Sequence, residues 1–359
     1  MSAPKKILIL KMSALGDVVH TLPTLETLRA NYPDAHIAWV VEERFRSLID
    51  DHPDLDEVIA VNTRRWRKQI NKDTFREIRQ IVRELREKKF DLVLDFHGLL
   101  KSGLFARLSQ AKDSWGFHKS NCKEAFSSFL INNHAPPMEA DLHVVERNLT
   151  LAQAALPCAQ TPMRFDLPQS PSGDALIENY FRDHPEMSRR RLAGINPGAG
   201  FRSKLWSLEK FAELGDRLSA DHNFSILVTW GPGEEGMAQS IAARMQEPCW
   251  VAPATTIVES LSIYRRLDLF IASDSGPAHL SAALNRPTVA LFGPTNPARN
   301  GPYGAQTRCV FKKLPCSFCW KRTCPLGTDE CMQSISVEDV LESVHTVLQA
   351  PPAPTLAQP

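Results

Sequence analysis

A carboxylate follows the first apolar run of the chain and is the first candidate for chemistry. The segment KMSALGD, residues 11–17, comes directly after a strand predicted at Lys6–Leu10. Gly16 lets the backbone turn sharply, and Asp17 would then lie at the carboxyl end of that strand. A carboxylate there could act as a general base toward an acceptor hydroxyl. The alternative is that Asp17 caps the following helix, and the motif alone favours neither.

A glycine-rich turn in the second half of the chain could hold an anion. In NPGAGFRSKLW, residues 196–206, a predicted strand ends in a turn whose backbone amides could approach a phosphate, and Lys204 adds a positive charge. Ala199 and Gly200 lack bulk, as close approach of a phosphate requires. The alternative is an ordinary strand-to-helix turn with a solvated lysine.

The most specific segment is SDSGPAHLSAAL, residues 273–284. Asp274 ends a predicted strand, and Ser275 and Gly276 open a helix whose N-terminal amides can bind a diphosphate. His279 lies four residues beyond Ser275, about one helical turn on, and could form a hydrogen bond to a phosphate or to a sugar. The alternative is a capped helix with a buried histidine.

Two further residues could contact the ligand of the second half of the chain. WGPGEE, residues 230–235, ends a strand with two carboxylates, and an acid in this place can bind ribose hydroxyls. Glu234 is the candidate, unless it only supplies charge favourable to the helix dipole. Thr255 is a further candidate for contact with the same ligand.

A basic cluster, TRRWRKQ at residues 63–69, surrounds Trp66. One short cluster in a protein with a net charge of +1 does not make a nucleic-acid-binding face, so no nucleic-acid partner is expected. A local anionic acceptor, carboxylate or phosphate, fits better, and a solvated loop is the alternative. The candidate acceptor-binding residues are Arg64, Arg65, Lys68 and Lys123, and Lys101 and Lys119 could extend the same surface.

Four cysteines gather near the C-terminus as Cys316-x2-Cys319-x4-Cys324-x6-Cys331. The spacing could hold zinc or an iron–sulfur cluster, but it lacks the paired CxxC motifs of a strong zinc signature. Reduced thiols in a loop are an equal alternative, and no catalytic metal is predicted.

Alternating strands and helices must position these groups. Strands are predicted at residues 6–10, 36–41, 57–61 and 91–96, with helices at 22–31, 75–88, 99–108 and 143–156. The alternation restarts with strands beginning near residues 192, 225, 267 and 287, and ends in a helix at 337–348. This order predicts an α/β fold of two doubly wound parallel sheets, with ligands at the carboxyl ends of strands.

The same pattern predicts the domain boundaries. With 359 residues the chain is too long for one ordinary core. We expect an N-terminal lobe at residues 1–165 and a C-terminal lobe at 190–335, with a cleft between them. The proline-rich stretch at about 156–190 has no clear period and is predicted to be a linker. A terminal helix is expected at 336–349, and a disordered tail would occupy 350–359.

Composition limits the class of protein. A hydrophobic content of 43% with 23% charged residues is typical of a folded globular chain. The apolar run at residues 7–10 is too short for a signal peptide, and no stretch could span a bilayer. We therefore expect a cytoplasmic protein, at most peripheral to a membrane, with mostly reduced cysteines.

Taken together, these segments resemble the lipopolysaccharide heptosyltransferases, inverting glycosyltransferases of family 9. The resemblance runs from about residue 5 to 349, with LKMSALGDVVHTLPTL, VNTRRWRK, DFHGLLKSGLFARL, HVVERNL and SDSGPAHLSAALNRPTVALFGPTNP as its blocks. AWVVEE followed by RRWRK is most similar to the heptosyltransferase I branch, which adds the first heptose to Kdo. CSFCWKRTCPLGTDECM is more similar to the heptosyltransferase II branch.

The resemblance implies a GT-B fold that takes ADP-heptose as donor and Kdo2-lipid A as acceptor, with no cofactor, no metal and a transient contact with the inner-membrane surface. The lobe at residues 1–165 would bind the acceptor and the lobe at 190–335 the nucleotide sugar, and the terminal helix at 336–349 would pack back toward the first lobe. Asp17 would be the base, Lys204 would contact donor phosphate or sugar, and Glu234 the ribose. Asp274 would hold the heptose. Ser275, Gly276 and His279 would hold the diphosphate. Only backbone contacts carry over at Ala199 and Gly200, where the family can carry hydroxyl residues. The basic residues would bind the acidic acceptor.

Other functions stay open at this point. One is a related transferase that adds a later core sugar, and another is a catalytically idle nucleotide-sugar-binding module. A dehydrogenase or epimerase is disfavoured because no GxGxxG fingerprint follows the first strand.

Overall fold

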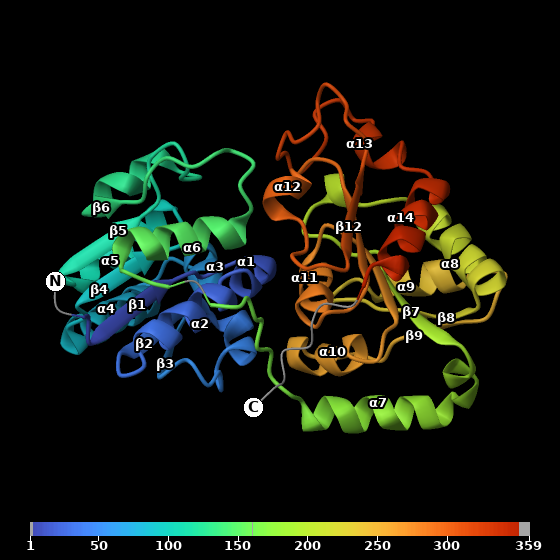
Figure 1. Ribbon diagram of the computed structural model, residues 1–359, viewed down its shortest axis with the longest axis horizontal. Coiled ribbons are helices and arrows are strands. Elements are labelled where there is room, and N and C mark those ends of the chain that lie inside the picture. The colour runs from blue at the N-terminus through green and yellow to red at the C-terminus, as the bar shows by residue number, and fades with distance from the viewer. Residues whose placement is uncertain (1–2, 160, 352–359) are drawn as a thin grey trace. The chain divides into compact units, whose positions relative to one another are not determined.

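The computed structural model describes residues 3–159 and 161–351, which form two α/β units (Figure 1). The units are Met1–Pro168 and Gln169–Pro359. Each contains one six-stranded sheet in which every strand pairing is parallel, as predicted. Parallel pairing follows from the sequence because each strand is separated from the next by a crossover segment.

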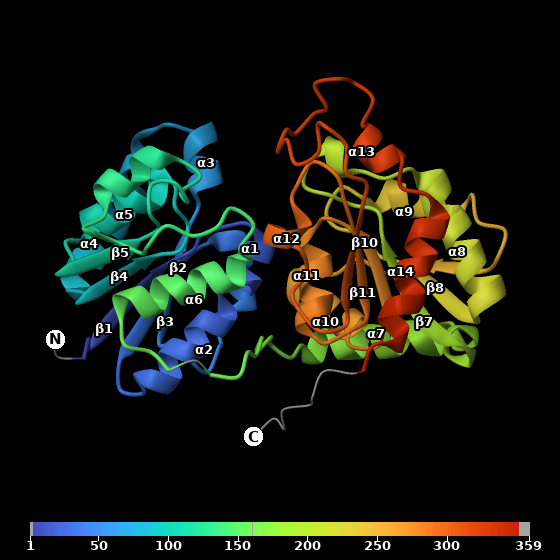
Figure 2. The ribbon, with the colours of Figure 1, turned by 45° about the horizontal axis from the view of Figure 1, so that its top comes forward.

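The first sheet has the strand order β3-β2-β1-β4-β5-β6. Its central strands are almost wholly buried because helices cover both faces. Figure 2 shows α2 and α6 running side by side over this sheet, and α4 and α5 also contact each other. The strands are β1 (Lys6–Leu10), β2 (His36–Glu42), β3 (Glu57–Val61), β4 (Leu92–Asp95), β5 (Asp113–Gly116) and β6 (Asn133–His134).

The helices of the first unit begin where side chains can cap them. The Asn71 side chain accepts from the Thr74 amide at 2.9 Å and starts α4, which ends at a left-handed residue, Lys89. The helices are α1 (Leu15–Val19), α2 (Leu22–Asn31), α3 (Thr63–Lys68), α4 (Lys72–Lys88), α5 (Leu100–Ser109) and α6 (Val144–Ala155), with 3-10 turns η1 (Glu43–Leu48) and η2 (Ala125–Leu130).

The second sheet has the order β12-β11-β10-β7-β8-β9, which is the same topology as the first. Strands β7, β8, β10 and β11 fall where the sequence predicts them. The strands are β7 (Arg191–Asn196), β8 (Phe224–Val228), β9 (Cys249–Val251), β10 (Leu269–Ser273), β11 (Thr288–Phe292) and β12 (Thr307–Phe311). The helices are α7 (Pro171–Asp183), α8 (Leu208–His222), α9 (Glu235–Ala242), α10 (Ile257–Tyr264), α11 (Gly276–Ala283), α12 (Pro297–Asn300), α13 (Glu330–Gln333) and α14 (Val337–Gln349), with 3-10 turns η3 (Pro185–Arg189) and η4 (Arg202–Lys204).

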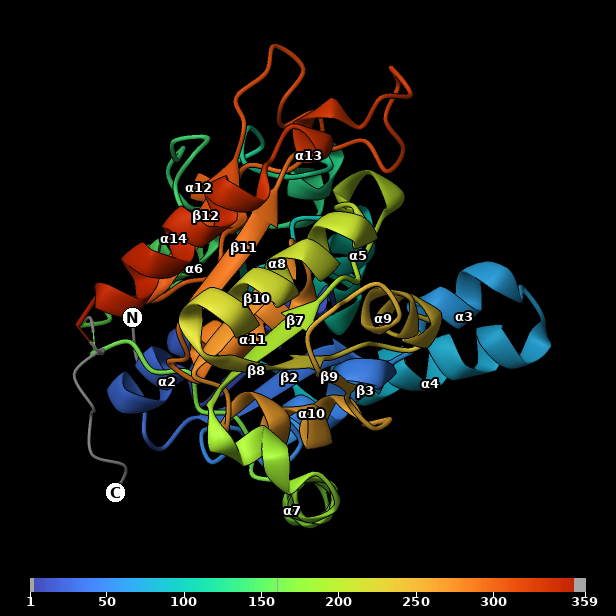
Figure 3. The same ribbon diagram turned by 90° about the vertical axis from the view of Figure 1, so that its right-hand side faces the viewer.

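The segment before the second sheet differs from the expectation. The stretch predicted to be a linker contains the thirteen-residue helix α7, which starts at Pro171 and packs against α10. Proline at the first turn of a helix is favourable, so this residue starts the helix instead of excluding it. The apolar face of α14 packs on β11, β12 and α8 within its own unit (Figure 3). The expected packing of this helix toward the first lobe stays a prediction.

Most of the predicted tail lies outside the described residues, which end at 351. Among the described helices, none combines the length and the apolar composition that crossing a bilayer requires.

Candidate active site

The strand order places one ligand-binding edge in each unit. In the first sheet the order reverses between β1 and β4, and in the second between β7 and β10. Open parallel sheets bind ligands at the carboxyl ends of strands beside such a switch point. Asp17 follows β1, Lys204 follows β7 and Asp274 follows β10. The residues selected from the sequence therefore gather at the two switch points.

Asp17 lies in the first turn of α1, and both of its oxygens are engaged. Oδ2 accepts the Ala14 amide at 2.9 Å, and Oδ1 lies 3.3 Å from the ammonium of Lys11. The Asp17 side chain is 34% exposed, whereas that of Lys11 is 6% exposed. The two readings of the sequence are thus compatible, because one oxygen caps the helix and the other stays beside a buried cation with access to solvent.

The environment of Asp17 keeps it ionised. Burial raises the pKa of the carboxyl, but the Lys11 ammonium and the Ala14 amide outweigh burial, and the pKa of Asp17 lies below its usual value of 3.8. The group is therefore a carboxylate that can accept a proton at neutral pH. Its low pKa makes it a weak base on its own.

Lys11 and the end of β4 belong to the first switch point, and the sequence reasoning did not select them. The Lys11 ammonium donates to the Phe96 carbonyl at 2.7 Å, which ties the loop after β1 to the residue after β4. Asp95, the last residue of β4, accepts the amides of His97 and Gly98 at 2.9 and 3.2 Å and the Ser102 hydroxyl at 2.9 Å. Burial raises the pKa of Asp95 to about 6.

The predicted acceptor-binding cluster forms α3, a helix where the sequence allowed a loop. Arg64, Arg65 and Lys68 are exposed, while Trp66 is buried and its indole donates to Glu77 at 3.0 Å. Arg65 also pairs with Glu77. The buried indole holds α3 in place and leaves the basic side chains at the surface.

A polar cluster connects α3 to the end of β2 and the start of α5. The Thr63 hydroxyl donates to the Glu42 carboxylate, and the Lys101 ammonium lies 3.3 Å from the same hydroxyl and 3.7 Å from Glu42. Burial lowers the pKa of Lys101, and so do the nearby cations Arg67 and Arg44, whereas Glu42 raises it. Arg44, which the sequence reasoning did not select, therefore belongs to the same positive surface. Lys119 and Lys123 are exposed on the loop after β5.

In the second unit a buried ion pair forms the centre of the site. The Lys204 ammonium lies 2.6 Å from Asp274 Oδ2, and the two side chains are only 11% and 7% exposed. The Thr295 hydroxyl, in the loop after β11, donates to the same oxygen. Lys204 also lies over the Phe201 ring, 4.4 Å from its centroid. These contacts join the loops after β7, β10 and β11.

The glycine-rich turn has room for a neighbouring carboxylate. Glu234 accepts the Gly231 amide at 2.9 Å, and burial raises the pKa of Glu234. A Cβ on Gly198 would lie 2.0–2.4 Å from the Glu234 carboxylate, so only glycine fits there without a shift of that side chain. A Cβ on Gly200 would meet nothing within 4 Å.

Other predicted donor contacts surround this turn. The Ser275 hydroxyl and the side-chain Oδ1 of Asn196 are buried without a hydrogen-bond partner within the described ranges. Buried polar atoms of native proteins are normally paired, so these two are candidates for contact with a ligand. Gly276 opens α11, His279 is buried on it, and Thr255 lies half-buried in the loop before α10.

The cysteine segment packs against the glycine-rich turn. The Ser203 hydroxyl donates to the Lys321 carbonyl at 2.6 Å. Burial and the nearby thiols of Cys316, Cys319 and Cys324 raise the pKa of Cys331 to about 11. Over residues 3–159 and 161–351, no group of three or more potential ligands is arranged to hold a metal ion, so the structural-metal alternative gains no support.

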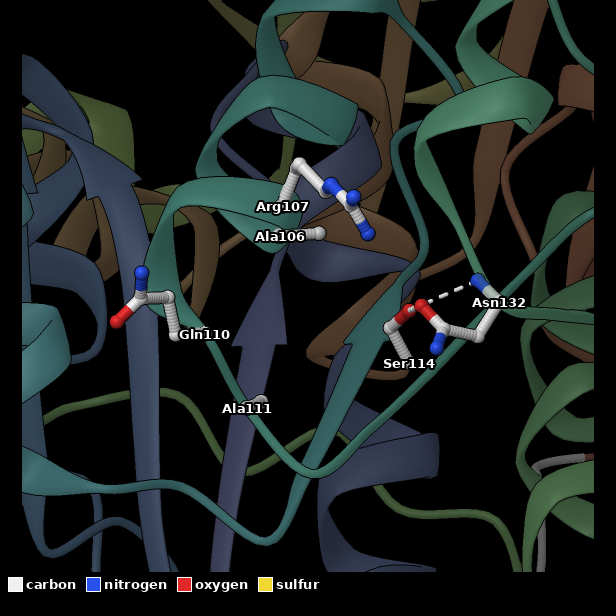
Figure 4. Close-up of a pocket in the computed structure, with 6 residues that line it drawn as sticks. All are labelled: Ala106, Arg107, Gln110, Ala111, Ser114 and Asn132. Carbon is white, nitrogen blue, oxygen red and sulfur yellow. Dashed lines mark hydrogen bonds between the residues drawn. The ribbon is translucent and has the colours of Figure 1, made fainter.

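A cavity of about 290 Å³ in the first unit lies away from the switch point of that unit. Figure 4 shows its lining, in which the Ser114 hydroxyl bonds Asn132 at 2.9 Å near the amino end of β5. None of the predicted site residues lines this cavity, and it has no part in the site.

Proteins of known family resemble this chain across both units. Residues 78–329 match the model of glycosyltransferase family 9 (heptosyltransferase). Lipopolysaccharide heptosyltransferase 1 of Pseudomonas aeruginosa is 32% identical over 330 residues, which cover 89% of this chain and 87% of the relative. Lipooligosaccharide heptosyltransferase 2 of Campylobacter jejuni is 26% identical and covers 96% and 98%.

Solved structures agree with this comparison. The Escherichia coli heptosyltransferase WaaC with bound ADP has a TM-score of 0.74 at 27% identity, covering 95% of this chain and 99% of that one. The same enzyme with ADP-2-deoxy-2-fluoro heptose has a TM-score of 0.70 and covers 94% and 99%.

Proposed function

Because the chain belongs to glycosyltransferase family 9, the heptosyltransferases, we propose that it transfers L-glycero-D-manno-heptose from ADP-heptose to a Kdo residue of Kdo2-lipid A. The observation that carries this proposal is the pair of switch points. One presents an accessible carboxylate, Asp17, beside exposed cations, and the other presents a buried Lys204–Asp274 pair among backbone amides. The first set suits an acidic acceptor, and the second suits a nucleotide diphosphate sugar.

The reaction is a single in-line displacement at the anomeric carbon of the heptose. Asp17 takes the proton of the acceptor hydroxyl, and the acceptor oxygen forms a new bond to the anomeric carbon. The bond from that carbon to the β-phosphate oxygen breaks on the opposite face, so the configuration inverts and ADP leaves with the bonding electrons. A general base contributes roughly 10²–10⁴-fold to such a step.

The second unit stabilises the leaving group. Negative charge grows on the β-phosphate as the bond breaks, and the amides at the start of α11 together with Lys204 suit that charge. Asp274 holds the heptose hydroxyls, and Glu234 holds the ribose. Ser275, Gly276 and His279 hold the diphosphate, with backbone contacts at Ala199 and Gly200 and a further contact from Thr255. The unpartnered Ser275 hydroxyl supports this assignment.

We propose that the transfer needs no metal. The chain has one Asp-x-Asp triplet, Asp54–Asp56, just before β3 and therefore at the amino end of that strand. The Asp56 carboxylate accepts the Ile37 amide at 2.7 Å and pairs with Arg29, so it is occupied by the fold. Lys204 and the α11 amides supply positive potential instead.

The acceptor binds through the basic surface of the first unit. Arg64, Arg65, Lys68 and Lys123 are exposed and suit the carboxylates of Kdo and the phosphates of lipid A. The match to proteins named heptosyltransferase 1 favours the first heptose. A later heptose remains the second candidate because the relative named heptosyltransferase 2 covers as much of the chain.

A membrane contact of the first unit would give access to a lipid-anchored acceptor. Phe126 and Phe129 of η2 are 74% and 80% exposed, and η2 packs on α5, where Leu100 and Leu104 are 43% and 50% exposed. With Lys123 nearby in sequence, these apolar side chains suit a transient contact with an anionic bilayer surface of the cytoplasmic side. Co-sedimentation with phosphatidylglycerol vesicles should fall for the Phe126→Ser, Phe129→Ser double variant.

The activity is tested by mass spectrometry of the product formed from ADP-heptose and Kdo2-lipid A. The proposal expects one added heptose with the native chain. Kdo2-lipid A that already carries one heptose distinguishes the second candidate. Tight ADP binding without any product would identify an idle binding module and end the proposal.

A further inference from the structure

His97 has an unusual place at the first switch point. It lies two residues beyond β4, and its backbone amide donates to Asp95 at 2.9 Å, so its main chain is fixed. Both ring nitrogens are buried, yet neither has a hydrogen-bond partner in the part of the chain that the structure describes. A buried polar atom left unpaired is costly, and native folds contain few.

The surroundings of His97 are those of the proposed base. Lys11 donates to the carbonyl of Phe96, the residue before His97, and lies 3.3 Å from Asp17. Burial, together with the Lys11, Lys101 and Lys123 cations, lowers the pKa of His97 to about 3, although the Asp17 carboxylate raises it. The ring is therefore neutral, with one nitrogen a donor and the other an acceptor.

We propose that the His97 imidazole binds a hydroxyl group of the acceptor sugar, next to the hydroxyl that Asp17 deprotonates. This inference rests on the proposed function. A neutral imidazole and a sugar hydroxyl group each donate and accept, so they complement each other. A carboxylate only accepts and would leave one ring nitrogen unpaired, so it is better held by the nearby cations. His97 thus orients the acceptor, and no proton is transferred through it.

The decisive variant is His97→Phe, which keeps a ring of similar size and removes both nitrogens. We expect the KM for the acceptor to rise about tenfold, because the variant loses one to two neutral hydrogen bonds to the acceptor. The KM for ADP-heptose should not change. The thermal midpoint should stay the same or rise, because the variant also removes two unpaired polar atoms. His97→Gln, which restores a donor and an acceptor, should recover part of the acceptor affinity.

A matched control is His52→Phe in the same unit. His52 is also buried, and burial lowers its pKa to about 4, but its Nδ1 accepts the Asp54 amide at 3.1 Å. This variant should lower the thermal midpoint and leave both KM values unchanged. A His97→Phe protein that behaves like this control would show that His97 is structural and would overturn the inference.

Direct binding separates this inference from the activity. Calorimetry with a Kdo disaccharide, which lacks the lipid, should give weaker binding to His97→Phe than to the native chain. Equal affinities would overturn the inference and leave the transferase activity standing. Weaker binding by the variant, together with a native chain that makes no product, would support the inference and end the proposed activity.

Discussion

The two switch points each contain a lysine–aspartate pair, but the pairs differ in access and in restraint. Lys11 and Asp17 are 3.3 Å apart and Asp17 is 34% exposed, whereas Lys204 and Asp274 are 2.6 Å apart and Asp274 is 7% exposed. Asp274 also accepts the Thr295 hydroxyl. The same topology thus yields one accessible carboxylate and one that is buried and held in a fixed position.

The difference follows from where each aspartate stands relative to its helix. Asp17 lies inside the first turn of α1, so its carboxylate turns back to the Ala14 amide and keeps one edge open. Asp274 precedes α11 and follows β10 directly, so it remains between the loops after β7 and β11. A proton acceptor needs access, and a sugar-binding carboxylate needs a fixed position. The comparison therefore assigns different roles to two residues with the same chemistry.

The largest effect is expected for Asp17→Asn. The amide keeps the shape of the side chain but cannot take a proton, so turnover should fall by roughly 10²–10⁴-fold. Calorimetry should give the same affinity for ADP, because the proposed donor contacts belong to the second unit. Asp274→Asn is the matched control and should mainly weaken binding of ADP-heptose. Equal turnover of Asp17→Asn and the native chain would break the comparison.

Lys204→Met should have the second largest effect, on stability. It leaves the Asp274 carboxylate buried without its cation, and breaking a buried pair in this way costs about 3–5 kcal/mol. Urea denaturation should show a lower free energy of unfolding. The Lys11→Met variant should cost less, because Asp17 is partly exposed and keeps the Ala14 hydrogen bond. An equal loss in the free energy of unfolding for the two lysine variants would show that the two aspartates are equally restrained.

Much of this arrangement is predictable from the sequence. The bounds of β1 and α2 agree with the apolar pattern, and Asp17, Lys204 and Asp274 follow predicted strands. Short-range patterns suffice here because a buried parallel strand is a continuous apolar run and its ligand edge is its carboxyl end.

The rest depends on contacts between distant segments. Lys11 reaches the Phe96 carbonyl across 85 positions, a contact that exists only because β1 and β4 are neighbours in the sheet. No local signal shows that the His97 ring lacks a hydrogen-bond partner among the described residues, since that depends on everything packed around it. The helix α7 was missed because the prolines in this stretch interrupt the apolar period, and the sequence alone does not show that Pro171 starts a helix.

The pH dependence of Lys11→Met should sharpen the comparison further. In the native chain the pKa of Asp17 lies below 3.8, so the base stays ionised and kcat/KM should show no acid limb from it above about pH 5. Without the ammonium, burial dominates and raises this pKa. The variant should then lose activity as the pH falls, and a profile from pH 5 to 9 measures the loss. A variant profile with the native shape would show that Lys11 does not set the ionisation of Asp17.

The smallest effect is expected for Arg64→Ala, which tests whether the first unit binds an anion at its surface. Arg64 is exposed on α3, and an exposed charge pair is worth up to about 1 kcal/mol, so the KM for Kdo2-lipid A should rise about two- to fivefold. The effect should shrink as salt is added because exposed charges are screened, whereas the effects of Asp17→Asn and Lys204→Met should not. Arg76→Ala is the matched control, since Arg76 is 81% exposed on α4 and pairs with Asp73 at 3.5 Å on the same helix. The control should leave KM unchanged at every salt concentration. A rise in KM for Arg64→Ala that does not depend on salt would mean that this arginine acts through the fold, and the first switch point would then lack its proposed surface for an acidic acceptor.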